Sequence, residues 1–146
     1  MTHPMMARVA VAQACVAKFD GQPFAWGECD CAKLAAFALQ GLGYKPSYAR
    51  FGRYRSALGA RRALRREGFA DTTDWIDSIH GLARIAPAAA LPGDIVGLPG
   101  EEGWTALTVA LGNDRLLGFH LAAAGCAVVQ PLVAPLFAWR AAPCRS

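Results

Sequence analysis

The chain of 146 residues carries a formal net charge of +4, with 54% hydrophobic and 18% charged residues. This composition excludes a generally disordered chain, and the length predicts one domain over residues 1–146. No apolar run approaches the ~20 residues of a membrane-spanning helix. The N-terminal stretch lacks the basic start and long apolar centre of a signal peptide, so we expect synthesis in a cytoplasm without secretion by a signal peptide.

The first half of the chain predicts helices. Apolar residues recur every three or four positions over residues 5–19, which predicts a first helix that ends at the Gly- and Pro-containing stretch 20–23. A second helix is expected to begin after Asp30, a favourable N-cap residue, and to run over residues 31–40. This helix is almost entirely apolar, so we expect it to be central and buried.

Two shorter helices are expected next. Residues 55–66 predict a third helix, ended by Glu67-Gly68, with apolar residues beneath a basic face. A short fourth helix is expected over residues 74–80, with Thr72 or Thr73 as its cap.

The second half of the chain has the period of two that is typical of strands. Strands are expected over residues 94–98, 104–111, 115–121, 125–130 and 136–141, with a turn at Gly112-Asn113-Asp114. Helices followed by a small antiparallel meander predict an α+β layered architecture.

The strand over residues 104–111 has two unlike faces. One face carries Leu107, Val109 and Leu111, and the other carries Trp104, Ala106, Thr108 and Ala110. Small side chains let a helix approach a sheet closely. We therefore expect the helix that begins at Cys31 to pack on the small-residue face.

Seven of the fifteen basic residues lie within residues 50–66: Arg50, Arg53, Arg55, Arg61, Arg62, Arg65 and Arg66. Such a cluster can contact phosphates, but no nucleic-acid-binding motif surrounds it. We favour a docking surface for another protein, with Arg61, Arg62, Arg65 and Arg66 as its contact residues.

The sharpest local feature is Trp26-Gly27-Glu28-Cys29-Asp30-Cys31, which runs directly into the second helix. A cysteine in the first helical turn feels unpaired backbone N–H groups and the positive end of the helix dipole, which favours the thiolate. The alternative is a small buried residue. Five cysteines without a signal peptide indicate reduced thiols, and their spacing is not that of a zinc site, so we expect no metal and no cofactor.

Three motifs in a fixed order resemble the NlpC-type cysteine peptidases over about residues 26–120. They are Asp30-Cys31 opening a buried helix, Pro92-Gly93-Asp94-Ile95-Val96 entering a strand, and Leu111-Gly112-Asn113 closing the next strand. The resemblance implies a papain-like α+β domain, with N-terminal helices on an antiparallel sheet. It also implies cleavage of peptide bonds in bacterial cell-wall peptides.

The chain also resembles a group of short prophage-encoded proteins found among phage tail genes. They share a Trp-Gly-x-x-Asp-Cys start, a central Gly-Asp and a C-terminal Ala-Trp-Arg, which are here Trp26 to Cys31, Gly93-Asp94 and Ala138-Trp139-Arg140. This resemblance implies a tail-tip or tail-assembly role with other tail proteins as partners. The chain is then expected in the host cytoplasm during assembly and afterwards in the virion.

The NlpC resemblance assigns the nucleophile to Cys31. Counting back from Gly112-Asn113 puts the position of the family's catalytic histidine at Ala106, which cannot act as a base. His120, two or three residues beyond the expected position of the orienting polar residue, is the candidate substitute.

Structural roles are expected for the other motif residues. We expect Asp30 to cap the second helix, Asp94 to fix a turn, and Trp26, next to Gly27, and Trp139 to anchor packing.

Three functions follow from these patterns. The first is a degenerate NlpC-like module in a phage tail tip. The second is an active cysteine peptidase or amidase that uses Cys31 and His120 on cell-wall peptides. The third is a basic nucleic-acid-binding protein centred on residues 50–66.

Overall fold

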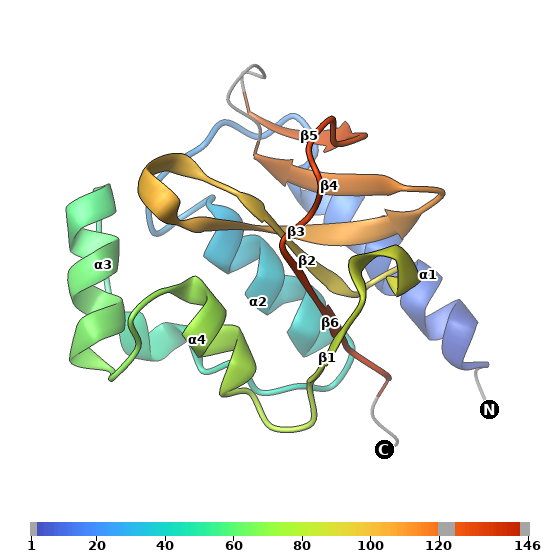
Figure 1. Ribbon diagram of the computed structural model, residues 1–146, viewed down its shortest axis with the longest axis horizontal. Coiled ribbons are helices and arrows are strands. Elements are labelled where there is room, and N and C mark those ends of the chain that lie inside the picture. The colour runs from blue at the N-terminus through green and yellow to red at the C-terminus, as the bar shows by residue number, and fades with distance from the viewer. Residues whose placement is uncertain (1–2, 120–124, 144–146) are drawn as a thin grey trace.

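The computed structural model describes residues 3–119 and 125–143, and Figure 1 shows its helices and its sheet. The helices are α1 (Pro4–Phe19), α2 (Cys31–Gly41), α3 (Ala57–Arg66) and α4 (Thr72–Asp77). The strands are β1 (Ala83–Ile85), β2 (Ile95–Pro99), β3 (Thr105–Gly112), β4 (Arg115–Phe119), β5 (Cys126–Val129) and β6 (Phe137–Arg140). The α+β architecture is confirmed.

Side-chain caps decide where the helices begin. Asp30 accepts a hydrogen bond from the Lys33 backbone N–H at 2.8 Å and caps α2. Ser56 caps α3. The expected cap of α4 was wrong, because Asp71 accepts from the Asp74 N–H at 3.0 Å and starts this helix earlier. It also ends earlier than expected, at Asp77.

The sheet is antiparallel, with the strand order β1-β6-β2-β3-β4-β5. Strands β2 to β5 form the predicted meander, and Asn113 and Asp114 both have the positive φ that a tight hairpin turn requires. The last strand does not extend the meander. It returns across the sheet to pair with β2 and with β1, a strand the sequence analysis did not predict.

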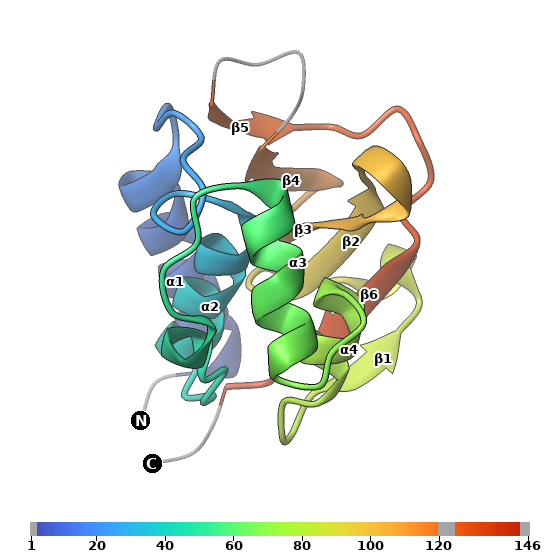
Figure 2. The same ribbon diagram turned by 90° about the vertical axis from the view of Figure 1, so that its left-hand side faces the viewer.

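Helices α1 and α2 cover one face of the sheet, and α3 and α4 stand at its side (Figures 1 and 2). Leu34 and Leu39 of α2 are fully buried in one core with Leu107 and Val109 of β3. The prediction that α2 packs on the small-residue face was therefore wrong. Ala110 belongs to a second, smaller cluster on the other side of the sheet. The larger side chains bury more apolar area against the helices, which explains this choice of face.

The described helices contain no span that is long and apolar enough to cross a membrane.

Candidate functional site

A tight turn precedes α2. The Asp30 carboxylate is 2% exposed and also accepts a hydrogen bond from the Gly27 N–H at 2.8 Å. Gly27 has a φ of +75°, and a Cβ at this position would collide with the Tyr54 backbone oxygen. Glycine is therefore required here, both for the backbone conformation and for the close approach of residue 54.

Two tyrosines complete the surroundings of Asp30. The Tyr54 hydroxyl donates to the Asp30 carboxylate at 2.5 Å, and the Tyr48 and Tyr54 hydroxyl oxygens are 2.9 Å apart. Burial raises the pKa of Tyr48 to about 12, and burial together with the Asp30 charge raises the pKa of Tyr54 further. Both hydroxyls therefore stay protonated at neutral pH. The carboxylate accepts from two backbone N–H groups and one phenol, which is a structural role.

Cys31 is the first residue of α2 and lies against β3. Its side chain is partly buried in the main core, and its sulfur accepts a hydrogen bond from the Leu107 backbone N–H. Burial raises the pKa of the thiol to about 11, and the Asp30 charge adds to this effect. Hydrogen bonds from the backbone at Leu107, Cys31 and Ala32 lower the pKa by less.

The backbone N–H groups at the start of α2 lower the pKa of the thiol, as expected, but they do not decide its value. Removal of the sulfur from water outweighs the helix N–H groups, because the charged form loses its hydration when it is buried. At neutral pH the thiol of Cys31 is neutral.

Ala106, where the resemblance to the NlpC-type peptidases would put a histidine, does not face Cys31. Leu107 and Val109 point toward the helices, so Ala106 and Ala110, which alternate with them, point to the other side of β3. Thr105 is on the helix-facing side, but its hydroxyl is 3.0 Å from that of Thr73. Ala106, reached by counting back from Gly112-Asn113, thus lies on the face of β3 away from the helices, and the pairing of β3 with β4 shifts register between Ala110 and Gly112.

His120 lies outside the described residues. Among residues 3–119 and 125–143, the histidines are His3, which caps α1, and His80, which is exposed beyond α4.

Contacts of neighbouring residues place both histidines relative to α2. Gly81, next to His80, lies beside the ring of Tyr44, which follows the C-terminal end of α2. Gly93 lies beside both Leu42 and Arg8, so the N-terminal part of α1 is at that same end. Both histidines are thus near the end of α2 opposite to Cys31.

Cys29 lies before the cap and forms an isolated backbone bridge with Ala25. Burial raises the pKa of its thiol. The bridge places residues 26–28 on a turn, and Trp26 is 39% exposed with its ring against that of Phe24. Trp26 is thus a half-exposed residue whose packing contact is the ring of Phe24. No three His, Cys, Asp or Glu side chains of the described residues come together as a group that could hold a metal ion.

The Gly-Asp and Ala-Trp-Arg motifs meet around Asp94, which is fully buried. Its carboxylate accepts from Arg8 Nη1 at 2.8 Å and from Arg140 Nε at 3.0 Å, and from the backbone N–H groups of Leu91 and Ala141. Asp94 thus closes the turn before β2 and joins it to α1 and to β6. The contribution of Arg8 was missed, although a single charge on the buried stripe of α1 is a signal for such a pair.

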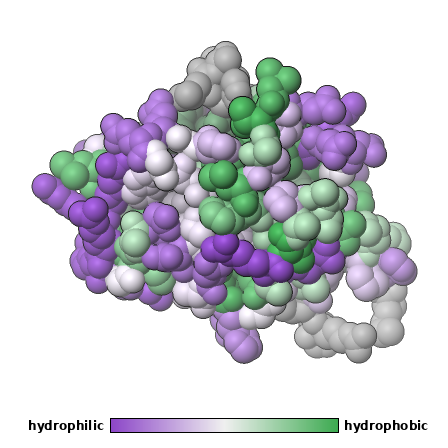
Figure 3. Space-filling model, viewed as in Figure 1, coloured by the Kyte–Doolittle hydropathy of each residue, from purple (hydrophilic) through white to green (hydrophobic). Residues whose placement is uncertain are grey.

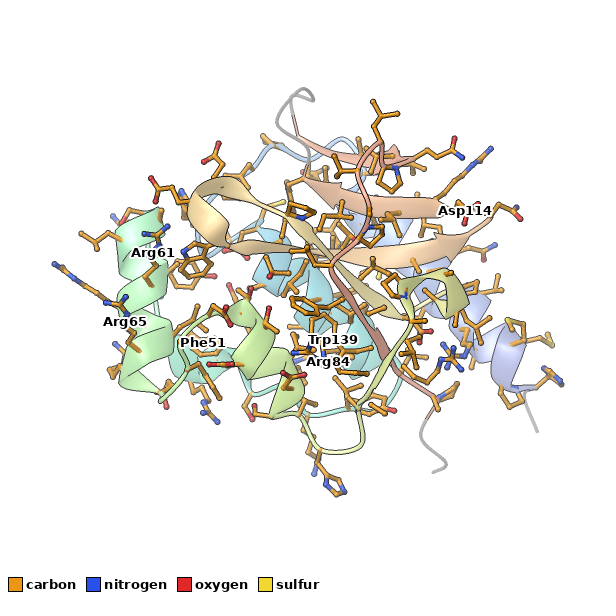
Figure 4. The ribbon with its side chains drawn as sticks, in the orientation of Figure 1. Phe51, Arg61, Arg65, Arg84, Asp114 and Trp139 are labelled. Atoms are coloured by element: carbon orange, nitrogen blue, oxygen red, sulfur yellow. The ribbon has the colours of Figure 1, made fainter. Side chains whose placement is uncertain are left out.

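Trp139 points to the opposite side from Arg140. Its indole N–H donates to Asp77 at the end of α4 at 2.7 Å, and Arg84 of β1 binds the same carboxylate. The hydrogen bonds from Arg84 and Trp139 hold the pKa of Asp77 below its usual range. Figure 4 shows Arg84 and Trp139 side by side in front of the helices. The C-terminal motif therefore fastens α4 and β1 to the sheet.

The four arginines predicted to contact a partner fall into two kinds. Arg61 pairs with Glu102 at 2.6 Å and lies over the ring of Trp104, and Arg66 donates to the Phe51 carbonyl at 3.2 Å. Arg62 and Arg65 are exposed. In Figure 4 Arg65 points away from the molecule, whereas Arg61 points toward the β2–β3 hairpin.

Comparison with known proteins identifies a family for this chain. No curated protein and no solved structure matches the chain. A family model described as a domain of unknown function, DUF6950, matches residues 6–141, which include the α2 start, Asp94 and the Ala-Trp-Arg motif. The chain belongs to the DUF6950 family.

Proposed function

We propose that the chain is a phage or prophage tail-tip or tail-assembly protein in which an NlpC-like module docks other tail proteins and does not cleave peptides. The observation that carries the non-catalytic part is the packing of Cys31 at the start of α2 against the main core that contains Leu107, where burial raises the pKa of the thiol to about 11. The tail role rests on the resemblance of the three motifs to short proteins encoded among phage tail genes. Its place is the host cytoplasm during assembly and then the virion.

The chemistry of amide cleavage supports this reading of Cys31. The thiolate is the attacking form, and a thiol with a pKa of about 11 is ionised at pH 7 in roughly one molecule in 10⁴. A positioned base adds about 10²–10⁴-fold and then protonates the leaving amine. Asp30 does not serve as that base, because its carboxylate already accepts three hydrogen bonds.

An active peptidase is the second candidate. It is favoured by the position of Cys31, at the start of a buried helix and against the backbone of β3, where N–H groups of Cys31 and Ala32 surround the sulfur. This function needs His120 as the base.

A peptide-release assay on purified peptidoglycan separates the two candidates. The wild type is compared with Cys31→Ala, with His120→Ala and with Cys29→Ala, a matched thiol that lies outside the helix. We expect no release of peptide fragments by any of the four proteins. Release by the wild type and by Cys29→Ala that is abolished in both Cys31→Ala and His120→Ala would establish the peptidase and overturn the proposal.

The tail role has its own test. Mass spectrometry of purified tails and of tail-assembly intermediates, made from the genome that encodes the chain, is expected to detect it in one or both. Its absence from both, while it is expressed in the same cells, would contradict a role in tails.

A further inference from the structure

The charge of this chain is concentrated on one segment. Residues 50–66 contain seven arginines and no acidic residue, whereas the other eight basic residues share the rest of the chain with eleven acidic ones. The segment therefore carries a positive charge that exceeds the net charge of the whole chain. Figure 3 shows that the side of the molecule formed by α3 is largely hydrophilic.

Intramolecular contacts explain three of these arginines. Arg61 binds Glu102 and the ring of Trp104, and Arg66 donates to the Phe51 carbonyl. Arg50 is 3.4 Å from Glu67 and lies over the ring of Phe69. These three side chains fix α3 to the hairpin and to the preceding turn.

The other four arginines have no such role. Arg53, Arg55, Arg62 and Arg65 are exposed, and none of them makes a hydrogen bond, ion pair or ring contact with the described residues. Leu58 on the same helix is 56% exposed. Positions 58, 62 and 65 are spaced by four and three, so their side chains share one face of α3. Figure 4 shows Arg65 pointing away from the molecule, and Figure 1 shows no other element beyond α3 on that side.

We propose that this α3 outer face, formed by Leu58, Arg62 and Arg65 with Arg53 and Arg55 beside it, binds an acidic protein segment that also supplies an apolar side chain for Leu58. This inference rests on the proposed docking role, and it describes the docking partner by its negative charge and its apolar side chain. Unpaired guanidinium groups attract carboxylates and hold them in a planar, two-pronged geometry. An exposed leucine among them favours a protein, because a phosphate backbone offers it no apolar contact.

The test uses the whole chain and two synthetic helical peptides rich in glutamate. One peptide carries a stripe of leucines, and the other carries serines at the same positions. Fluorescence anisotropy at low and at physiological salt measures the affinity of each peptide, and a short DNA duplex serves as a third probe. The variants are Arg62→Ala/Arg65→Ala and Leu58→Ser. Arg115→Ala is the matched control, since Arg115 is exposed beside Asp114, at the opposite edge from α3 in Figure 4.

The wild type is expected to prefer the leucine peptide, with affinity that falls as salt rises. Two exposed ion pairs predict a loss of roughly 2- to 30-fold in the double arginine variant. Leu58→Ser is expected to remove the preference for the leucine peptide over the serine peptide. Arg115→Ala is expected to change neither the affinity for the leucine peptide nor this preference. All altered side chains are exposed, so circular dichroism and melting are expected to match the wild type.

Equal binding of the leucine peptide by the wild type and the double arginine variant would overturn the inference. Tighter binding of the duplex than of the leucine peptide, lost in the double variant, would overturn it in favour of nucleic acid. None of these variants touches Cys31. Peptide release from peptidoglycan would therefore refute the proposed function without bearing on binding at the α3 outer face. Equal peptide binding by the wild type and the double arginine variant would refute this binding face without bearing on the protonation state of Cys31.

Discussion

Replacement of Asp94 by alanine is the perturbation with the largest expected effect on stability. The Asp94 carboxylate is fully buried, and the Arg8 guanidinium that it pairs with is 4% exposed. Arg8 cannot lose its proton in the protein, so Asp94→Ala leaves a buried positive charge. The remaining acceptor for its Nη1 is the Pro92 carbonyl at 3.2 Å.

The size of the effect follows from this geometry. Removal of one partner from a buried ion pair costs about 3–5 kcal/mol, against a total stability of about 5–15 kcal/mol for an ordinary domain. Asp94→Ala also leaves the N–H of Ala141 and the Nε of Arg140 without their acceptor. We therefore expect a loss of about 3–5 kcal/mol in the free energy of unfolding, with the end of β6 detached from the turn before β2.

Urea denaturation measures this loss. The proteins are the wild type, Asp94→Ala, Arg8→Met and the double variant, with Glu28→Ala as an exposed acidic control. Arg8→Met removes the charge that Asp94→Ala leaves unpaired. The loss of unfolding free energy in the double variant is therefore expected to be smaller, by at least about 1 kcal/mol, than the sum of the losses in the two single variants. A loss below about 1 kcal/mol for Asp94→Ala, or full additivity, would refute the reasoning.

Two further substitutions test the turn that precedes α2. Gly27→Ala is expected to cost about 1–3 kcal/mol, because its Cβ meets the Tyr54 carbonyl at a positive φ, whereas Gly21→Ala has the same strain but open space and is expected to cost less. Equal melting temperatures for the two variants would contradict this. Tyr54→Phe removes the hydroxyl that binds Asp30 and is expected to lower the free energy of unfolding in urea by about 1–3 kcal/mol. An unchanged denaturation midpoint would show that water replaces the phenol.

Local signals were enough to predict most elements of the fold. The apolar period and the cap at Asp30 placed α1 and α2 within one residue of their observed starts. Strand β1 was missed because three residues are too few to display a period. The return of β6 to β2 was missed for a different reason, since the choice of a strand's neighbour depends on tertiary contacts such as those of Trp139 and Arg140.

The position of Cys31 was predicted from the sequence, but the protonation state of its thiol was not. The sequence placed Cys31 in the first turn of a buried helix, and its pKa then depended on packing against Leu107, which no local pattern reveals. The alternation along β3 separated Leu107 and Val109 from Ala110 correctly, but Trp104 packs against the main core instead of with Ala110. Small size was also the wrong criterion for the face that meets α2. The tyrosines beside Asp30 were missed because they come from a segment in which the arginines dominate the pattern.

The central claim is that Cys31 is a neutral thiol to which no histidine of residues 3–119 and 125–143 serves as a base. Alkylation by iodoacetamide, followed by mass spectrometry of the peptides, measures the reaction rate of this cysteine by itself as a function of pH. The same protein in urea is the control, where an ordinary thiol pKa of about 8.5 is expected.

Because burial raises the pKa of Cys31 to about 11, the thiolate is scarce below that pH and increases about tenfold with each pH unit. We expect the alkylation rate in the folded protein to keep rising through pH 9 without a plateau, while the rate in urea levels off. A plateau in the folded protein at or below the pH of the urea control, lost in His120→Ala, would show an activated Cys–His pair and contradict the neutral thiol.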